Sequence, residues 1–127
     1  AESLLWEFTA GCYRQARGHV GAGRPAIAVE LLSLAIRTLK EWGSSTHRQA
    51  QTANHARLLR QLALAYLELP DHCMAAARAW EAVDMESPQS QGRAASLLVL
   101  IQTLCCMQPP VMAADGTFGG GLLGSEA

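Results

Sequence analysis

Residues 54–69 read Asn54-His-Ala-Arg-Leu-Leu-Arg-Gln-Leu-Ala-Leu-Ala-Tyr-Leu-Glu-Leu69. In this stretch a large apolar residue, Leu59, is followed four positions later by Ala63 and three positions after that by Tyr66. Residues that recur at steps of three and four lie on one face of an α-helix. The same spacing occurs once earlier in the chain, at Trp6, Ala10 and Tyr13. The sequence therefore predicts two helices with similar packing faces.

Each of these helices is followed by a second run that also has small and bulky residues at helical spacing. Small residues at the contact points allow two helix axes to approach to roughly 8–10 Å. Each pair of runs therefore predicts a helical hairpin, the first over about residues 3–42 and the second over about residues 50–87. The residues expected to pack in the second helices are Ala28, Leu32, Ala35, Ala76, Trp80 and Val83, with Pro88 closing the second hairpin.

Local signals predict where the helices begin and end. Pro25 favours the first turn of a helix, where its missing N–H costs nothing. Gly43 is expected to act as a C-cap, and Asp71 as the N-cap of the fourth helix. Gly18, with the glycines that follow it, is expected to break the first helix after Arg17. The five expected helices span about residues 3–17, 25–42, 50–69, 73–86 and 90–107.

The composition agrees with a small helical domain. Of the 127 residues 50% are hydrophobic and 17% are charged, and the net charge is −1, so no basic excess favours nucleic-acid binding. Nothing in the chain resembles a signal peptide, because no basic region leads into an apolar run and a cleavage site. The longest apolar run, within residues 94–107, is shorter than the roughly 20 residues that span a bilayer. We expect an intracellular protein without membrane contact, and a segment of a longer chain because it begins without Met.

The fifth helix and the end of the chain differ from the hairpins. Residues 97–101 are apolar on all sides, so this helix needs cover on more than one face. Pro109-Pro110 and Gly119-Gly120-Gly121 interrupt any helical period after it. We therefore expect a helical domain over residues 1–108 and a Pro/Gly-rich linker or loop over residues 109–127.

The repeated hairpins are typical of tetratricopeptide repeats (TPR), which are helix–turn–helix units. The expected fold is all-α, with TPR-like hairpins stacked as a short right-handed solenoid. A consensus TPR has a period of about 34 residues, whereas Tyr13 and Tyr66 are 53 positions apart. The units would therefore be irregular. An ordinary helical bundle without repeats is the structural alternative.

The stretch quoted above, together with Ala76, Trp80, Val83 and the following Ser87-Pro-Gln-Ser90, resembles the TPR-like domain of the meiotic Zip-four/Spo-twenty-two family. The opening Leu4-Leu5-Trp6 is also similar to that domain, and the resemblance covers about residues 3–107. Members of that family are long helical-repeat scaffolds that bring together proteins of meiotic crossover formation and chromosome synapsis. The resemblance implies a non-enzymatic scaffold segment in the nucleus.

The function expected from the repeats is protein–protein interaction without catalysis, a cofactor or a metal. A helix or extended peptide of a partner would lie in a groove lined by the first helices. Arg57 and Arg60 share one helix face and, with Gln61, form the expected solvent-facing contact for an acidic peptide. A structural TPR segment of a ciliary, axonemal or other large complex, in the cytoplasm or cilium, is the alternative of the same class.

A small cysteine- or metal-dependent activity is the alternative from another class. The residues that could carry it are His72, Cys73, Cys12, Cys105 and Cys106. These residues are scattered, whereas a structural zinc site uses four ligands in recognisable local pairs. The cysteines form no CxxC pair, so we expect them to be reduced and to act as small core residues.

Overall fold

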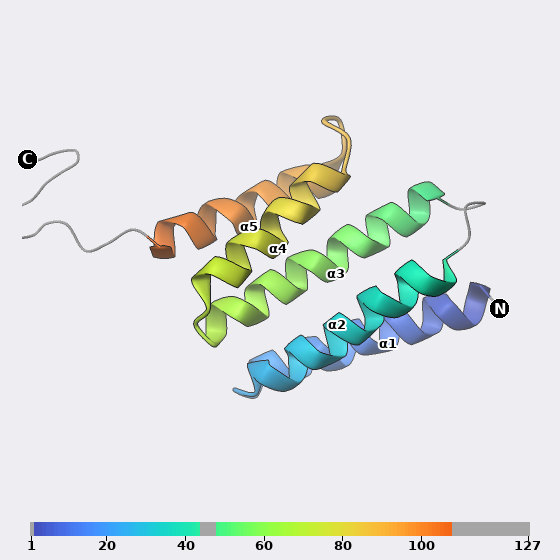
Figure 1. The fold of residues 1–127 in the computed structure, drawn as a ribbon, viewed down its shortest axis with the longest axis horizontal. Coiled ribbons are helices and arrows are strands. Elements are labelled where there is room, and N and C mark those ends of the chain that lie inside the picture. The colour runs from blue at the N-terminus through green and yellow to red at the C-terminus, as the bar shows by residue number, and fades with distance from the viewer. Residues whose placement is uncertain (1, 44–47, 108–127) are drawn as a thin grey trace, which may run out of the picture.

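The computed structural model describes residues 2–43 and 48–107, and within these ranges the chain forms five α-helices and no strand. The helices are α1 (Glu2–Gly21), α2 (Pro25–Trp42), α3 (Arg48–Glu68), α4 (His72–Met85) and α5 (Gln91–Met107). They pack against one another with α3 in the middle (Figure 1). The prediction of an all-α fold is confirmed. The expected linker over residues 109–127 lies outside the described residues.

Most helix ends follow the local signals. Pro25 occupies the first turn of α2, and Asp71 caps α4 by accepting a hydrogen bond from the Met74 backbone N–H at 3.2 Å. The Gly43 N–H donates to the Leu39 carbonyl oxygen at 2.9 Å, and a Cβ at Gly43 would lie 2.6 Å from the same oxygen. Gly43 therefore ends α2, as predicted, because only glycine fits there.

The predicted break of the first helix after Arg17 is wrong, because α1 continues through Gly18 to Gly21. A glycine inside a helix costs about 1 kcal/mol relative to alanine, which packing of the flanking residues offsets. The chain turns instead at Gly23, whose φ of 81° lies in the left-handed region. Only at this glycine does the turn require a conformation that other residues rarely adopt.

The helix contacts follow a regular order. Helices that are adjacent in sequence contact each other, and α3 also contacts both α1 and α5. Among the described residues, the backbones of α2 and α4 do not come close to each other, although both helices lie against α3. The two second helices therefore flank α3 with a gap between their backbones (Figure 1).

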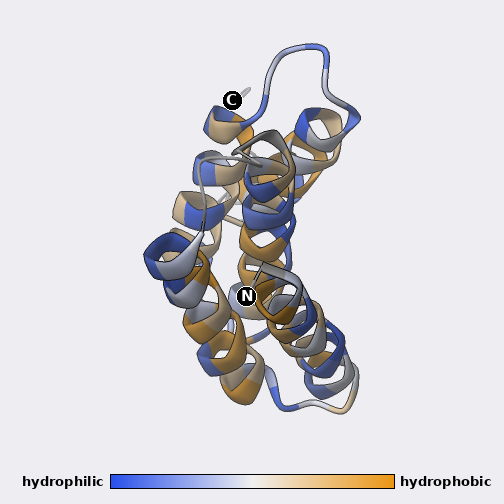
Figure 2. Ribbon diagram, turned by 90° about the vertical axis from the view of Figure 1, so that its right-hand side faces the viewer, coloured by the Kyte–Doolittle hydropathy of each residue, from blue (hydrophilic) through white to orange (hydrophobic). Residues whose placement is uncertain are grey.

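The larger core lies between α1, α2 and α3. Its fully buried side chains include Leu32 of α2 and Leu58 of α3, with leucines and isoleucine around them. Burying one such side chain stabilises the fold by about 1.5–3 kcal/mol. Hydrophobic and hydrophilic stretches alternate along the helical ribbons, as expected for helices with one buried side (Figure 2).

The second core, between α3, α4 and α5, is smaller. It consists of Ala63, Ala79, Val83 and Leu100. The side of α5 that faces its neighbours also buries two small polar residues, Ser96 and Thr103. Apart from Leu100, most of the large apolar residues of α5 lie on its exposed side: Leu97, Leu98, Ile101 and Leu104. In the part of the chain that is described, no helix is long and apolar enough to cross a membrane.

The buried faces differ in register from several expectations. Trp80 is 60% exposed, and the buried face of α4 consists of Ala75, Ala79, Ala82 and Val83. Ala76 and Trp80 are each one position after the buried Ala75 and Ala79, which places them about 100° further around the helix. They therefore lie beside the buried face of α4 and not on it. The expected packing residues that are buried are Ala28, Leu32, Ala35, Leu59, Ala63 and Val83. Those that are half-buried are Trp6, Ala10, Tyr13, Tyr66 and Ala76, and Pro88 is exposed.

Candidate functional site

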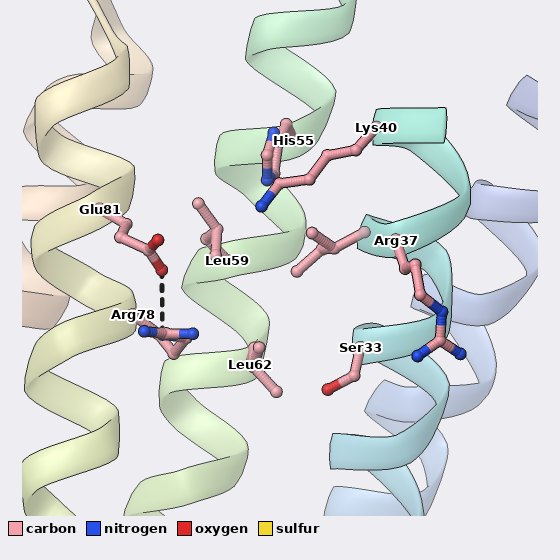
Figure 3. Close-up of a pocket in the computed structure, with 9 residues that line it drawn as sticks. Ser33, Arg37, Lys40, His55, Leu59, Leu62, Arg78 and Glu81 are labelled. Atoms are coloured by element: carbon pink, nitrogen blue, oxygen red, sulfur yellow. Dashed lines mark ion pairs between the residues drawn. The ribbon is translucent and has the colours of Figure 1, made fainter. Parts of the chain in front are cut away.

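A groove of about 250 Å³ runs between α2 and α4, with α3 beneath it (Figure 3). It exists because α2 and α4 both pack on α3 while their backbones do not come close to each other. Within each helix, the residues that line the groove are three, four or seven positions apart, as expected for residues on one helix face. They are Ser33, Ile36, Arg37 and Lys40 of α2, His55, Leu59 and Leu62 of α3, and Arg78 and Glu81 of α4.

The groove has an apolar floor and charged walls. Ile36, Leu59 and Leu62 are core residues whose remaining surface forms the floor. Arg37 and Lys40 stand on the α2 wall and are exposed. Arg78 and Glu81 stand on the α4 wall, where Arg78 Nε lies 2.9 Å from Glu81 Oε1. The arrangement presents a narrow and largely buried apolar strip between charged edges.

Most of the charged residues that line the groove are basic. Arg37, Lys40 and Arg78 are the basic residues of the lining, and Glu81 is its one acidic residue. His55 lies on α3 with the Lys40 ammonium group beside it (Figure 3). Burial lowers the pKa of His55 below 6.5, nearby Lys40 lowers it further, and Glu81 partly opposes this. The imidazole is therefore neutral at pH 7, and the lining has a net positive charge.

A second groove, of about 530 Å³, lies on the opposite side of α3. Arg57, which lines it, is two positions from both His55 and Leu59 of the first groove, or about 200° around the helix. The predicted contact residues Arg57 and Arg60 both line this second groove, whereas Gln61 lines neither. Its other lining residues are Trp6, Ala50, Ala53, Asn54, Glu86, Ser90, Gln91 and Gly92.

Arg60 is held by contacts within the chain. Its Nη1 lies 3.0 Å from Glu86 Oε1 and also donates to the Gly92 carbonyl and to Ser96 Oγ, both at 3.1 Å. The side chains of Arg60 and Glu86 are only 19% and 7% exposed. A Cβ at Gly92 would overlap the Glu86 carboxylate. The expectation that Arg60 faces solvent is therefore wrong, because the α4–α5 connection and the start of α5 cover it.

Arg57 differs from Arg60 in being exposed. Its guanidinium carbon lies 4.7 Å from the centre of the Tyr13 ring of α1, within the range of a cation–π contact. Its Nη2 also lies 3.4 Å from Asn54 Oδ1. Asn54 in turn donates to the buried Thr9 hydroxyl at 3.0 Å. These contacts join α1 to α3 and orient Arg57 across the second groove.

The cysteines do not form a shared site. Cys12 is buried, and burial raises the pKa of its thiol above 9.0, which disfavours the reactive thiolate. Cys73, Cys105 and Cys106 are exposed, so the expectation that the cysteines are core residues is correct only for Cys12. Within residues 2–43 and 48–107, no three His, Cys, Asp or Glu side chains are grouped so that they could hold a metal ion.

Comparison of the chain with protein-family models, with curated proteins and with solved structures gave no match. Sequence reasoning did not identify the groove between α2 and α4, whose lining residues come from three helices. The available signal was the presence of basic residues beside an apolar stripe, Arg37 and Lys40 on α2 and Arg78 on α4. These residues line one groove only because α2 and α4 both pack on α3.

Proposed function

We propose that the chain is a non-enzymatic protein-interaction unit, a segment of a TPR-like helical-repeat scaffold. The groove between α2 and α4 would receive a segment of a partner protein. The observation that carries this proposal is the combination of an apolar floor formed by α2 and α3 with charged groups along its edges on α2 and α4. Partner helices and extended peptides bind grooves of this kind by burying apolar side chains and pairing polar ones at the edges.

Two further observations support the proposal. The contacts from α1 to α3 and from α3 to α5, with no close approach of the α2 and α4 backbones among the described residues, are those expected of side-by-side hairpins. In the same part of the chain, Arg37 and Lys40 form no hydrogen bond or ion pair. Arg60, in contrast, is already engaged by Glu86. The groove between α2 and α4 is therefore the better candidate than the groove lined by Arg57 and Arg60.

The resemblance to the meiotic Zip-four/Spo-twenty-two family adds a specific form of this proposal. The partners would then be proteins of crossover formation and chromosome synapsis, and the protein would work in the nucleus. A structural segment in a ciliary or other large complex is the alternative of the same class. A thiol-based activity at Cys12 is disfavoured because burial raises the pKa of that thiol.

The experiment that tests the function is capture of proteins from meiotic tissue extract by three purified forms of the chain. These are the wild type, the variant Arg37→Glu/Lys40→Glu in the groove, and Arg57→Glu on the opposite side of α3. We expect a set of proteins, identified by mass spectrometry, that the wild type and Arg57→Glu retain and the groove variant loses. All three forms must have the same circular dichroism spectrum, because the altered residues are exposed.

Two outcomes would contradict the proposal. Equal capture by all three forms would mean that the groove binds no protein. Loss of capture by Arg57→Glu alone would move the binding site to the second groove, as the sequence first suggested.

A further inference from the structure

We propose that the occupant of the groove between α2 and α4 is an acidic amphipathic segment of a partner protein, with Asp or Glu residues beside a row of apolar side chains. This inference rests on the proposed function and adds the chemistry of the partner. Its basis is charge complementarity, since three basic residues and one acidic residue line an apolar floor.

The two walls of the groove are not equivalent. On α2, Arg37 and Lys40 are one helical turn apart, and neither is paired within the described residues. On α4, Arg78 already lies 2.9 Å from Glu81. A ligand carboxylate therefore finds unpaired positive charge along α2 and a mixed-charge edge along α4. The acidic residues of the partner should lie on its α2 side.

The pair on the α4 wall does not block the groove. The Arg78 and Glu81 side chains are 31% and 47% exposed, and partly exposed ion pairs contribute little to stability. A ligand carboxylate would therefore compete with Glu81 for the Arg78 guanidinium. Glu81 would repel an acidic group placed directly beside it, which fixes the orientation of the bound segment.

The floor selects for a protein segment over a simple anion. Ile36, Leu59 and Leu62 come from α2 and α3 and present an apolar strip between the two walls. Inorganic anions and nucleic-acid phosphates gain nothing from such a strip, whereas apolar side chains at helical spacing bury surface on it. The net charge of the whole chain is −1, so the positive character is local to the groove.

The test uses three synthetic peptides as probes. Each is a 14-residue alanine-based helix with three leucines at spacings of four and three, and the flanking positions are all Glu, all Gln or all Lys. Fluorescence anisotropy at low salt measures the affinity of each peptide for the full chain. We expect the Glu peptide to bind about tenfold more tightly than the Gln peptide, and the Lys peptide more weakly than both. Raising the salt to 0.5 M should remove most of that preference.

Variants of the chain test whether the preference for the Glu peptide depends on the basic residues of the groove. Arg37→Gln/Lys40→Gln should reduce the preference for the Glu peptide severalfold and leave the affinity for the Gln peptide unchanged. Arg57→Gln, on the opposite side of α3, should change neither. Equal binding of the Glu and Gln peptides to the wild type would overturn the acidic specificity but leave the proposed groove function intact. Failure of all three peptides to bind, with capture from extract independent of the groove, would overturn both.

Discussion

Two interiors flank α3, and they are built from different side chains. Between α1, α2 and α3 the buried residues are mainly leucine, isoleucine and alanine, with Leu32 and Leu58 fully buried. Between α3, α4 and α5 the apolar cluster contains two alanines, a valine and one leucine. There the hydrogen bonds of Arg60 to Glu86, Gly92 and Ser96 add a polar connection.

The two interiors differ in how far their contacts fix the positions of the helices. Apolar packing is proportional to buried area and has little direction, and between α1 and α3 one buried hydrogen bond, from Asn54 to the Thr9 hydroxyl, adds a directional contact. The Arg60 contacts are directional and reach the α4–α5 connection and two residues of α5. They add directional contacts to the packing of Leu100 on α3 and α4, whereas most of the large apolar residues of α5 are exposed. Leu98, for example, is 68% exposed.

The strongest test of the comparison is truncation of a core leucine. Leu32→Ala should lower the free energy of unfolding by about 2–5 kcal/mol, because it removes a fully buried side chain and leaves a cavity. Leu100→Ala, in the smaller core, should fall at the low end of that range. Urea denaturation followed by circular dichroism measures both.

The control for this experiment is Leu98→Ala, which alters an exposed residue of α5. It should change the free energy of unfolding by no more than about 0.5 kcal/mol. Losses of the same size for Leu32→Ala and Leu100→Ala would remove the distinction between the two cores.

The polar connection is tested by Arg60→Leu. This change leaves the Glu86 carboxylate buried without its cation, and it should cost about 2–3 kcal/mol, with the largest loss of amide protection in α5. The double variant Arg60→Leu/Glu86→Leu should recover much of the loss, because it removes both charges. Hydrogen exchange measured by mass spectrometry resolves the helices. Equal loss of protection in α1 and α5 would show that Arg60 has no special role at α5.

The sequence predicts the helices and most of their ends, because those features depend on nearby residues. Pro25, Gly43 and Asp71 act within one turn of their own helices, and all three behave as predicted. Gly18 shows the limit of this reasoning. Its cost as a helical residue is small, so the surrounding helix decides whether α1 continues.

The sequence does not predict which face of each helix is buried as reliably. Trp80 and Ala79 are neighbours on α4, and both fit an apolar stripe at helical spacing. The choice between them depends on where α3 and α5 lie, and the small Ala79 allows the closer approach. Arg60 poses the same problem, since its partners Glu86 and Gly92 are 26 and 32 positions away.

The candidate site was missed for a related reason. Sequence reasoning compared charges along one helix, and on α3 that procedure selected Arg57, Arg60 and Gln61. The groove between α2 and α4 instead combines Lys40, His55 and Arg78 from three helices. Such a combination has no signature in the spacing of any one segment. It follows only from the packing of α2 and α4 on either side of α3.

The smallest predicted effect concerns His55, which lies where the first and second hairpins face each other. Its pKa in the folded chain is below the ordinary 6.5, mainly because of burial and also because of Lys40. Well above pH 6.5 the imidazole is neutral in both the folded and the unfolded chain and contributes no pH dependence. As the pH falls below 6.5, the unfolded chain binds a proton more readily than the folded chain. His55 should therefore lower the stability of the fold as the pH decreases.

Urea denaturation at pH 7.5 and pH 5.5 measures this effect by comparing the wild type with His55→Gln, which should lose less stability over that interval. Two further variants distinguish the effect of α2 on the pKa of His55 from the effect of α4. Lys40→Gln removes a cation of α2 that lowers the pKa of His55, so it should weaken the pH dependence due to His55. Glu81→Gln removes a carboxylate of α4 that raises that pKa, so it should strengthen it. Changes of the same sign in both variants would contradict the position of His55 between the two hairpins.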